Sequence, residues 1–362
     1  MTVIGKLLDA FSVKQGGRAD AMDISENTQD KESDMRRTAI AMITVGCLAL
    51  WSLTLGGNSL PAATPYPVKP INLIIPVEAG SDADIVTRPL AAKASAILGK
   101  PVMIVNKPGG GSTIGYREIY AAKPDGYTIG MATITLVSSK VQGLMPLDYH
   151  DFSLIGTFYR MYANLYASTK TKHPFQSVQE VISFAKKNPG EVSMASAGVG
   201  MSLWVGAMAF IAGTGIDINV IPQTGAGGQS MLQVAGGHAD LTVTHSAAAK
   251  SQIDAGNVRF LAVLGDERDP AYPGVPTMKE VGYNVGWESL GIIIAPPKMP
   301  KEEMEKLTKA FETAAKDPEY QKFLKERFSN PFYLPPEKII PYLDVKRKVV
   351  REIMGKAGLL KE

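Results

Sequence analysis

One arrangement recurs in this chain and constrains its fold more than any other feature. Short apolar runs at 71–77, 101–105 and 127–131 alternate with stretches in which apolar residues recur at helical spacing. Turns containing glycine or aspartate separate these elements. A strand–helix–strand–helix–strand order is typical of a parallel sheet with helices on its faces. Residues 66–131 therefore predict an α/β fold.

The same order of strand, glycine loop and helix returns later in the chain. Strands are predicted at 192–195, 218–221 and 241–244, and glycine loops at 196–202 and 222–228. The chain has 362 residues, which favours two domains. The order of strand, glycine loop and helix is therefore predicted in both parts of the chain.

The amino-terminal residues have the layout of an export signal. A charged Met35-Arg36-Arg37 precedes an apolar run at 39–55, and small residues follow at 56–63. We expect 1–34 to be a disordered polar extension and 35–65 to be a signal peptide or membrane anchor. Cleavage, retention as an anchor and acylation at Cys47 all remain open, as does the choice of Met1 or Met35 as the start. Each alternative sends 66–362 across a membrane, which predicts a periplasmic protein.

Charge and residue usage exclude several classes of function. Lys and Arg total 38 against 35 for Asp and Glu, a balance that argues against a nucleic-acid binder. The single cysteine cannot form an internal disulfide or a cysteine-rich zinc site. No nucleophile elbow and no metal-ligand histidine spacing occur in the sequence. We therefore expect no catalytic residue, no metal and no cofactor, although His245, just after a strand, could reach a cleft.

Two glycine loops are the first candidates for a binding site. Loops 78–84 and 108–113 each follow a predicted strand and lead into a helix. Ligands of open α/β sheets bind at the carboxyl ends of the strands, and a helix start offers free N–H groups to an anion. Such loops can bind a carboxylate without arginine. The alternative is that the glycines only form tight turns.

Several blocks, in order along the chain, carry a resemblance to a known family. They are Tyr66-Pro67 with Lys69-Pro70-Ile71; Ile75-Pro76; Ala79-Gly80; Asp84-Ile85-Val86 with Arg88; Asn106-Lys107-Pro108-Gly109-Gly110-Gly111; Pro124-Asp125-Gly126-Tyr127-Thr128; Ser177-Val178-Gln179-Glu180 with Asn188-Pro189-Gly190; Gly236-Gly237-His238-Ala239-Asp240; and Pro273-Gly274-Val275-Pro276-Thr277. Over about residues 66–360 the chain resembles the tripartite tricarboxylate transporter receptors, also called the Bug family.

The resemblance implies a two-lobed α/β periplasmic binding protein of a type II-like kind, hinged by two crossover strands. Runs at 162–169 and 291–295 look like these strands. Lobe 1 would comprise 66–167 and 291–362, and lobe 2 would comprise 168–290. Residues 300–328 predict one amphipathic helix on lobe 1, with Met304, Leu307, Phe311 and Ala314 on one face and with Glu302–Lys306 and Glu305–Lys309 spaced for ion pairs.

The family also implies a function without chemistry. Its receptors capture small organic carboxylates, largely through backbone groups and water, and deliver them to a membrane permease. An enzyme acting on a small acid and a membrane-tethered carboxylate sensor are the alternatives. The expected ligand-binding residues are Glu78, Ala79, Gly80, Ser81, Asp84, Gly109, Gly110, Gly111, Ser112, Thr113, Thr133, Ser196, Gly198, Gly200, Met201, Ser202, Thr224, Gly225 and Ala226.

Two acidic residues in the first loop, Glu78 and Asp82, depart from the family pattern, and Asp84 is a third acid there. Glu78, Asp82 and Asp84 place three carboxylates where an anion is expected to bind. Either the ligand carries a cationic part, as an amino acid does, or Glu78 and Asp82 point to solvent. We expect Asp82 to face solvent and leave Glu78 open. Trp204 could stack on a ligand, but a core position is favoured for a large aromatic side chain.

Overall fold

The computed structural model describes residues 66–223 and 227–362. The expected polar extension at 1–34, the signal or anchor at 35–65 and the candidate ligand residues Thr224, Gly225 and Ala226 lie outside the described residues.

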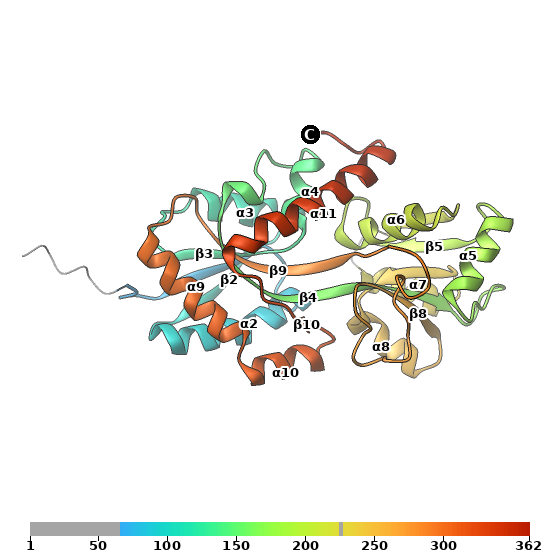
Figure 1. The fold of residues 1–362 in the computed structure, drawn as a ribbon, viewed down its shortest axis with the longest axis horizontal. Coiled ribbons are helices and arrows are strands. Elements are labelled where there is room, and N and C mark those ends of the chain that lie inside the picture. Colours follow the sequence, from blue (N-terminus) through green and yellow to red (C-terminus); the bar gives the residue numbers. More distant parts are fainter. Residues whose placement is uncertain (1–65, 224–226) are drawn as a thin grey trace, which may run out of the picture. The chain divides into compact units, whose positions relative to one another are not determined.

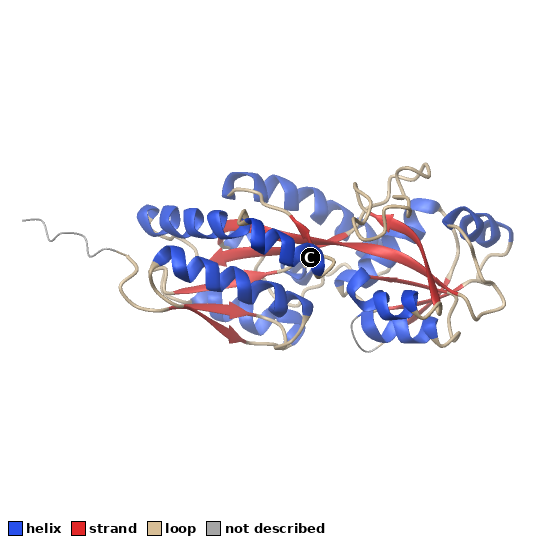
Figure 2. Cartoon of the chain, turned by 90° about the horizontal axis from the view of Figure 1, so that it is seen from below, coloured by secondary structure: helices blue, strands red, loops and turns tan. Residues whose placement is uncertain are grey.

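The first strands form the predicted parallel sheet. Strand β1 (Ile71–Ile75) pairs in parallel with β2 (Val102–Asn106) on one side and with β3 (Thr128–Ala132) on the other. Helix α2 (Asp82–Leu98) follows β1 and continues through Pro89. It ends at Gly99, which adopts a left-handed φ of 68° and donates its N–H to Ser95 O. Figure 2 shows helices on both sides of the strands.

Two antiparallel strands carry the chain between the lobes. Strand β4 (Ser153–Ser168) pairs with β9 (Glu288–Ala295) over 153–162, and β9 pairs with β3. From Ala163 onward β4 pairs instead with β7 (Leu241–Thr244) and β8 (Val258–Leu264). The sheet is therefore mixed, with the strand order β2-β1-β3-β9-β4-β7-β5-β6. Figure 1 shows β4 and β9 running side by side between the two groups of elements.

The second lobe repeats the parallel arrangement. Strand β5 (Ser193–Ser196) lies between β6 (Asn219–Pro222) and β7, parallel to both. Its helices are α5 (Val178–Lys187), α6 (Ser202–Thr214), α7 (Gly227–Ala235) and α8 (Ser246–Asp254).

The expected helix at 300–328 proves to be two helices. Helix α9 (Lys301–Ala315) ends before Asp317, and α10 (Pro318–Glu326) begins there. Asp317 caps α10 by accepting the N–H of Tyr320, and the residue before a proline is disfavoured in helical geometry. The Glu302–Lys306 pair is present at 2.7 Å, whereas Glu305 pairs with Lys301 and not with Lys309.

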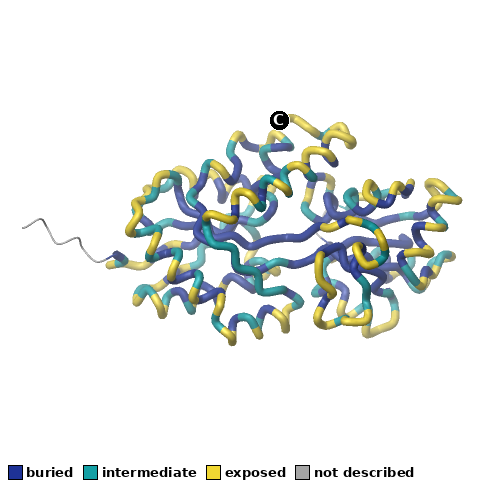
Figure 3. Tube along the Cα trace, in the orientation of Figure 1, coloured by how far each residue is buried: buried dark blue, intermediate teal, exposed yellow. Residues whose placement is uncertain are grey.

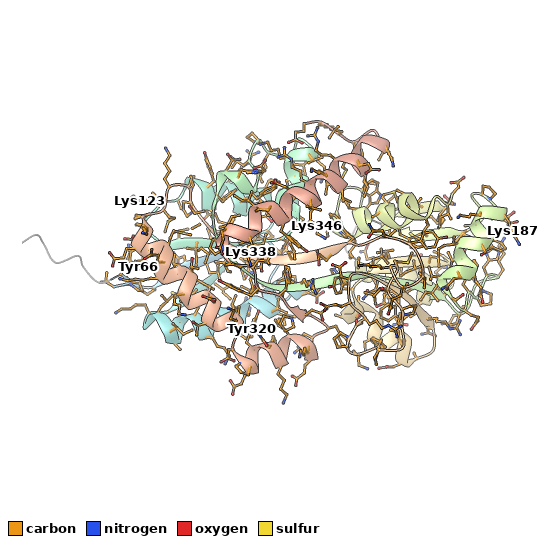
Figure 4. All side chains as sticks on the ribbon, in the orientation of Figure 1. Tyr66, Lys123, Lys187, Tyr320, Lys338 and Lys346 are labelled. Atoms are coloured by element: carbon orange, nitrogen blue, oxygen red, sulfur yellow. The ribbon has the colours of Figure 1, made fainter. Side chains whose placement is uncertain are left out.

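The carboxyl-terminal helix packs against the crossover strands. Helix α11 (Pro336–Lys356) places Tyr342 and Lys346 beside the buried Glu288 of β9. The Tyr342 hydroxyl donates to Glu288, and Lys346 Nζ lies 2.6 Å from its Oε1. Figure 4 labels Lys346 on this helix. The remaining elements are α3 (Thr113–Ala121), α4 (Thr135–Val141), β10 (Asn330–Pro331) and short 3₁₀ turns at Gly110–Ser112 and Tyr149–Asp151.

Burial follows the strands. The tube in Figure 3 is buried along β4 and β9 and exposed on the outer helix turns. Trp204 is 5% exposed and belongs to the core, as favoured from the sequence. Leu307, Phe311 and Ala314 are also buried, which confirms the predicted apolar face of α9.

The same substitution at two leucines tests this core. Leu307→Ala should lower the free energy of unfolding by about 2–5 kcal/mol, because a fully buried side chain leaves a cavity. Leu232→Ala, at a side chain that is 61% exposed, should change it by less than about 0.5 kcal/mol. Urea unfolding of both variants measures the difference. Equal losses would contradict the packing of α9 on the sheet.

Candidate functional site

A cavity lies where the carboxyl ends of strands from both lobes meet. Its volume is about 490 Å³, and Ser202, Leu203, Gly227, Gly228, Thr244, His245, Ala247 and Ala248 line it from the second lobe. From the first lobe and the crossover strands it is lined by Val77, Gly80, Ser81, Asp82, Ala83, Thr133, Ile134, Tyr159, Met161 and Ser289. None of these lining residues is Lys or Arg.

The loop after β1 is held in shape by Asp84. This buried carboxylate accepts hydrogen bonds from Gly80 N at 2.9 Å, from Asn106 Nδ2 at 2.9 Å and from Arg88 at 2.8 and 2.9 Å. Burial opposes the charge, but these donors outweigh it and lower the pKa of Asp84. The N-cap of α2 is Ser81, whose hydroxyl accepts the Asp84 N–H. Both carboxylate oxygens thus support the loop.

Helix starts face the cavity from the second lobe. The N-cap residues of α6 and α8 are Met201 and His245, and neither side chain caps its helix. The N–H groups of the first turn therefore lack intrahelical acceptors, and each start carries about half a positive charge. Ser202, Leu203 and Ala247, in these first turns, line the cavity. An anion is the ligand that such an arrangement stabilises.

A chain of polar side chains crosses one wall. Trp287 Nε1 donates to Ser202 Oγ at 3.1 Å, Ser202 Oγ lies 3.2 Å from Ser289 Oγ, and Ser289 Oγ lies 3.2 Å from His245 Nε2. Burial lowers the pKa of His245, while Asp82 acts in the opposite direction. At neutral pH the imidazole is therefore uncharged, and it serves as a hydrogen-bonding group.

Two further hydroxyl groups lie at the cavity. Thr244 is 1% exposed, and its Oγ1 has no hydrogen-bond partner among the described residues. Tyr159 is 1% exposed, and burial, followed by the charge of Asp82, raises the pKa of its hydroxyl. Leaving a buried hydroxyl unpaired costs free energy, so Thr244 is positioned to bond to something that enters the cavity.

Two acidic residues of the first loop, Asp82 and Glu78, take different positions relative to the cavity. Asp82 lines the cavity and is at the same time exposed, so the expectation that its side chain is accessible to solvent is confirmed. Glu78, which was left open, is exposed and is not among the lining residues. Asp82 is the first residue of α2, and this position turns it toward the second lobe.

The structure brings some of the predicted ligand residues together and leaves others outside. Gly80, Ser81, Thr133 and Ser202 line the cavity. Ala79, Glu78 and Asp84 belong to the same loop without lining it. The following predicted residues also lie outside the lining: Gly109, Gly110, Gly111, Ser112, Thr113, Ser196, Gly198, Gly200 and Met201. For these, direct ligand contact stays a prediction.

The position of the 108–113 loop has a topological reason. It follows β2, which is the edge strand of the order β2-β1-β3-β9 and therefore the strand of its lobe farthest from β9. A side chain at Gly110 would meet Thr113 Oγ1 at 2.6 Å, and one at Gly111 would lie 3.6 Å from Leu144. The loop thus packs against its own helix start and the residues after α4.

Several lining residues were missed by the sequence-based predictions. Tyr159, Met161 and Ser289 lie just outside the predicted bounds of the crossover strands at 162–169 and 291–295. Thr244 ends a strand that the sequence did predict, so the carboxyl-end rule applied to 241–244 points to it. His245, proposed to reach a cleft, does line the cavity.

Comparison with known proteins identifies the family. Residues 86–359 match the family described as tripartite tricarboxylate transporter family receptor. The chain belongs to this family. A UPF0065 protein of Cupriavidus necator is 29% identical over 87% of this chain and 96% of its own length. The Bordetella pertussis protein BugT is 30% identical over 65% of this chain and 73% of its own length.

Solved structures agree with this family assignment. The periplasmic binding protein BugD is 28% identical, with a TM-score of 0.66 over 82% of this chain and 100% of its own. A TctC solute-binding protein from Polaromonas has the same fold, with a TM-score of 0.71 at 24% identity over 80% of this chain and 99% of its own. The receptor is thus a periplasmic solute-binding protein of the two-lobed type. Within 66–223 and 227–362, no helix is both long and apolar enough to span a bilayer.

The unpartnered hydroxyl of Thr244 gives a test of the cavity. Thr244→Val keeps the shape of the side chain and removes a buried hydroxyl that has no partner in the described structure. The unliganded variant should be as stable as the parent or more stable, by up to about 1 kcal/mol, because a desolvated group is removed. Ligand affinity should fall about threefold to tenfold through one lost hydrogen bond. Thermal unfolding and calorimetric titration measure the two quantities, and unchanged affinity would remove Thr244 from the site.

The carboxylate of Asp84 predicts a pH-dependent stability. Its pKa is lowered on folding, so its contribution is present above the unfolded pKa of about 3.9 and is lost as pH falls through the folded value. Asp84→Asn should cost about 2 kcal/mol at neutral pH, and this cost should shrink in more acidic solution. Denaturant unfolding at neutral pH and near pH 3 measures it.

Asp217→Asn is the matched control for this substitution. Asp217 is exposed, and its side chain makes no ion pair with another described residue. It should cost little at either pH. A cost at Asp84 that does not change with pH would contradict the role given to its charge.

Proposed function

We propose that this receptor binds a small organic carboxylate in the cavity between its lobes and delivers it to the membrane permease of a tripartite tricarboxylate-type transporter. One observation carries the proposal. Uncapped starts of α6 and α8 face a cavity of about 490 Å³ whose lining contains no Lys or Arg. An anion can be held there by backbone N–H groups and hydroxyls.

The size of the cavity suits a small acid. Ligand pockets for small molecules span roughly 300–1,000 Å³. Two Rhodopseudomonas palustris proteins share this fold, one solved with adipate at 24% identity and one with bound malate at 23%. That likeness extends to the fold alone, so the carboxylate preference of this chain is argued from its own helix starts and from its family.

Residues of both lobes support binding by closure. We keep the lobe boundaries at 66–167 with 291–362 and at 168–290. In their support, β4 exchanges its partner β9 for β7 and β8 after Tyr162. Gln142, after α4, donates from Nε2 to Gly200 O at 3.0 Å and so joins the two proposed lobes. Closing the cleft removes water from the ligand and strengthens each hydrogen bond.

One contact favours a different class of function. Ser289 Oγ lies 3.2 Å from His245 Nε2, which is the spacing of a nucleophile and its base. However, Ser289 also contacts Ser202, and no carboxylate hydrogen-bonds to the other ring nitrogen of His245 among the described residues. A hydrolase would need that carboxylate to orient the ring. We therefore propose a receptor and not an enzyme.

Thermal unfolding with a panel of acids tests the proposal. A ligand that binds only the folded state stabilises it by about 2.7 kcal/mol at a concentration of 100 times Kd. We expect at least one small mono- or dicarboxylate to raise the unfolding temperature by several degrees. Sulfate and chloride at equal ionic strength serve as controls for salt effects.

The fate of the ligand separates the two classes of function. Nuclear magnetic resonance of the ligand after long incubation should show it chemically unchanged. Turnover of the acid would favour the hydrolase. If no carboxylate of a broad panel raised the unfolding temperature, the proposed function would be overturned.

A further inference from the structure

Among the described lining residues of the main cavity, Asp82 is the one Asp, Glu, Lys or Arg, and it has no ion-pair partner. It lines the cavity between the lobes and also an adjoining cavity of about 410 Å³. It forms no ion pair within 4.0 Å and no hydrogen bond through its carboxylate to another described residue. Its neighbour Asp84, by contrast, is held by Arg88, Asn106 and Gly80.

The nearby cations do not form an ion pair with Asp82. No Lys or Arg lines the main cavity, and the adjoining cavity contains Lys250 and Arg327. Lys250 lies 2.6 Å from Asp254 on its own helix, and neither cation is within 4.0 Å of Asp82. His245 faces the same cavity, but burial lowers its pKa and leaves it neutral at physiological pH.

The cavity is therefore dipolar. Asp82 sets a negative charge on the wall formed by α2, and it offsets the positive end of that helix. The uncapped start of α6 sets positive potential at Ser202 and Leu203, whereas the start of α8 lies beside Asp82, since Asp82 and Ala247 line the same adjoining cavity. A ligand with two or three carboxylates meets Asp82 with a like charge, whereas a ligand with one charge of each sign matches both walls.

We propose that the ligand of this receptor carries a cationic nitrogen beside its carboxylate, and that Asp82 binds the nitrogen. The chemical class is an amino carboxylate. This inference rests on the proposed function, since it names the substrate class of the same cavity. Thr244 gives an independent sign that a polar ligand completes this site, because its buried Oγ1 has no described partner.

The test compares pairs of acids that differ only in the cation. A methyl group has nearly the shape of an ammonium group, so aspartate is matched with methylsuccinate, glutamate with 2-methylglutarate and alanine with isobutyrate. Calorimetric titration of the purified protein gives Kd for each. For at least one pair we expect the amino acid to bind at least about tenfold more tightly, which corresponds to about 1.4 kcal/mol.

The variant Asp82→Asn then tests whether Asp82 causes the tighter binding of the amino acid. It keeps the shape of the residue and removes the charge, so the amino acid should lose about tenfold in affinity while its methyl analogue binds equally well or better. The analogue thus reports that the variant is folded and its carboxylate subsite intact. Asp217→Asn makes the same change of net charge at an exposed site away from both cavities and should alter neither ligand.

The outcomes separate this inference from the proposed function. Methyl analogues that bind as tightly as amino acids, or a preference that survives Asp82→Asn, would overturn the inference and leave the carboxylate receptor standing. If no member of any pair binds, the proposed function fails and the inference fails with it. Rising ionic strength should also reduce the preference, because Asp82 is exposed to solvent ions.

Discussion

The antiparallel pairing of β4 with β9 is the constraint on which the rest of the structure depends. It joins the parallel strands of the first lobe to those of the second, because β4 continues past Tyr162 into pairing with β7 and β8. This continuity brings the carboxyl ends of β1, β3 and β7 to a common cavity. Glu288, with its contacts to Tyr342 and Lys346, ties α11 to the same strand pair.

The pairing of β4 with β9 also determines which polar groups lie at the cavity. Helices α6 and α8 start at residues whose side chains do not cap them, so the N–H groups of their first turns have no side-chain partner from the N-cap. Hydroxyls and a neutral imidazole are the remaining polar groups at the cavity, and Asp82 is the one charged carboxylate among the described lining residues. Under the proposed function, the cavity would select ligands by the sign and spacing of their charges, without long flexible cations, which lose side-chain entropy when they bind.

Much of the local structure could be predicted from the sequence. The apolar runs at 71–77, 127–131 and 241–244 and the stop at Gly99 agree with the observed elements, since hydrophobic period and left-handed glycine are local signals. The break between α9 and α10 was missed although its signal, Asp317-Pro318, is present. Apolar spacing continues across this break and hides it from a periodicity argument.

Some features of the candidate site could likewise be predicted from the sequence, and others could not. The sequence alone determined that glycine loops precede helices, that loop 78–84 lies at the carboxyl end of a strand, where the cavity is found, and which family the chain resembles, because all three depend on residue order. Only the tertiary structure decided that β2 is an edge strand whose loop lies outside the lining of the cavity, that Ser289 meets His245, and that Asp82 and not Glu78 lines the cavity. Strand order and side-chain direction are set by pairings between residues far apart in the chain, which no local pattern records.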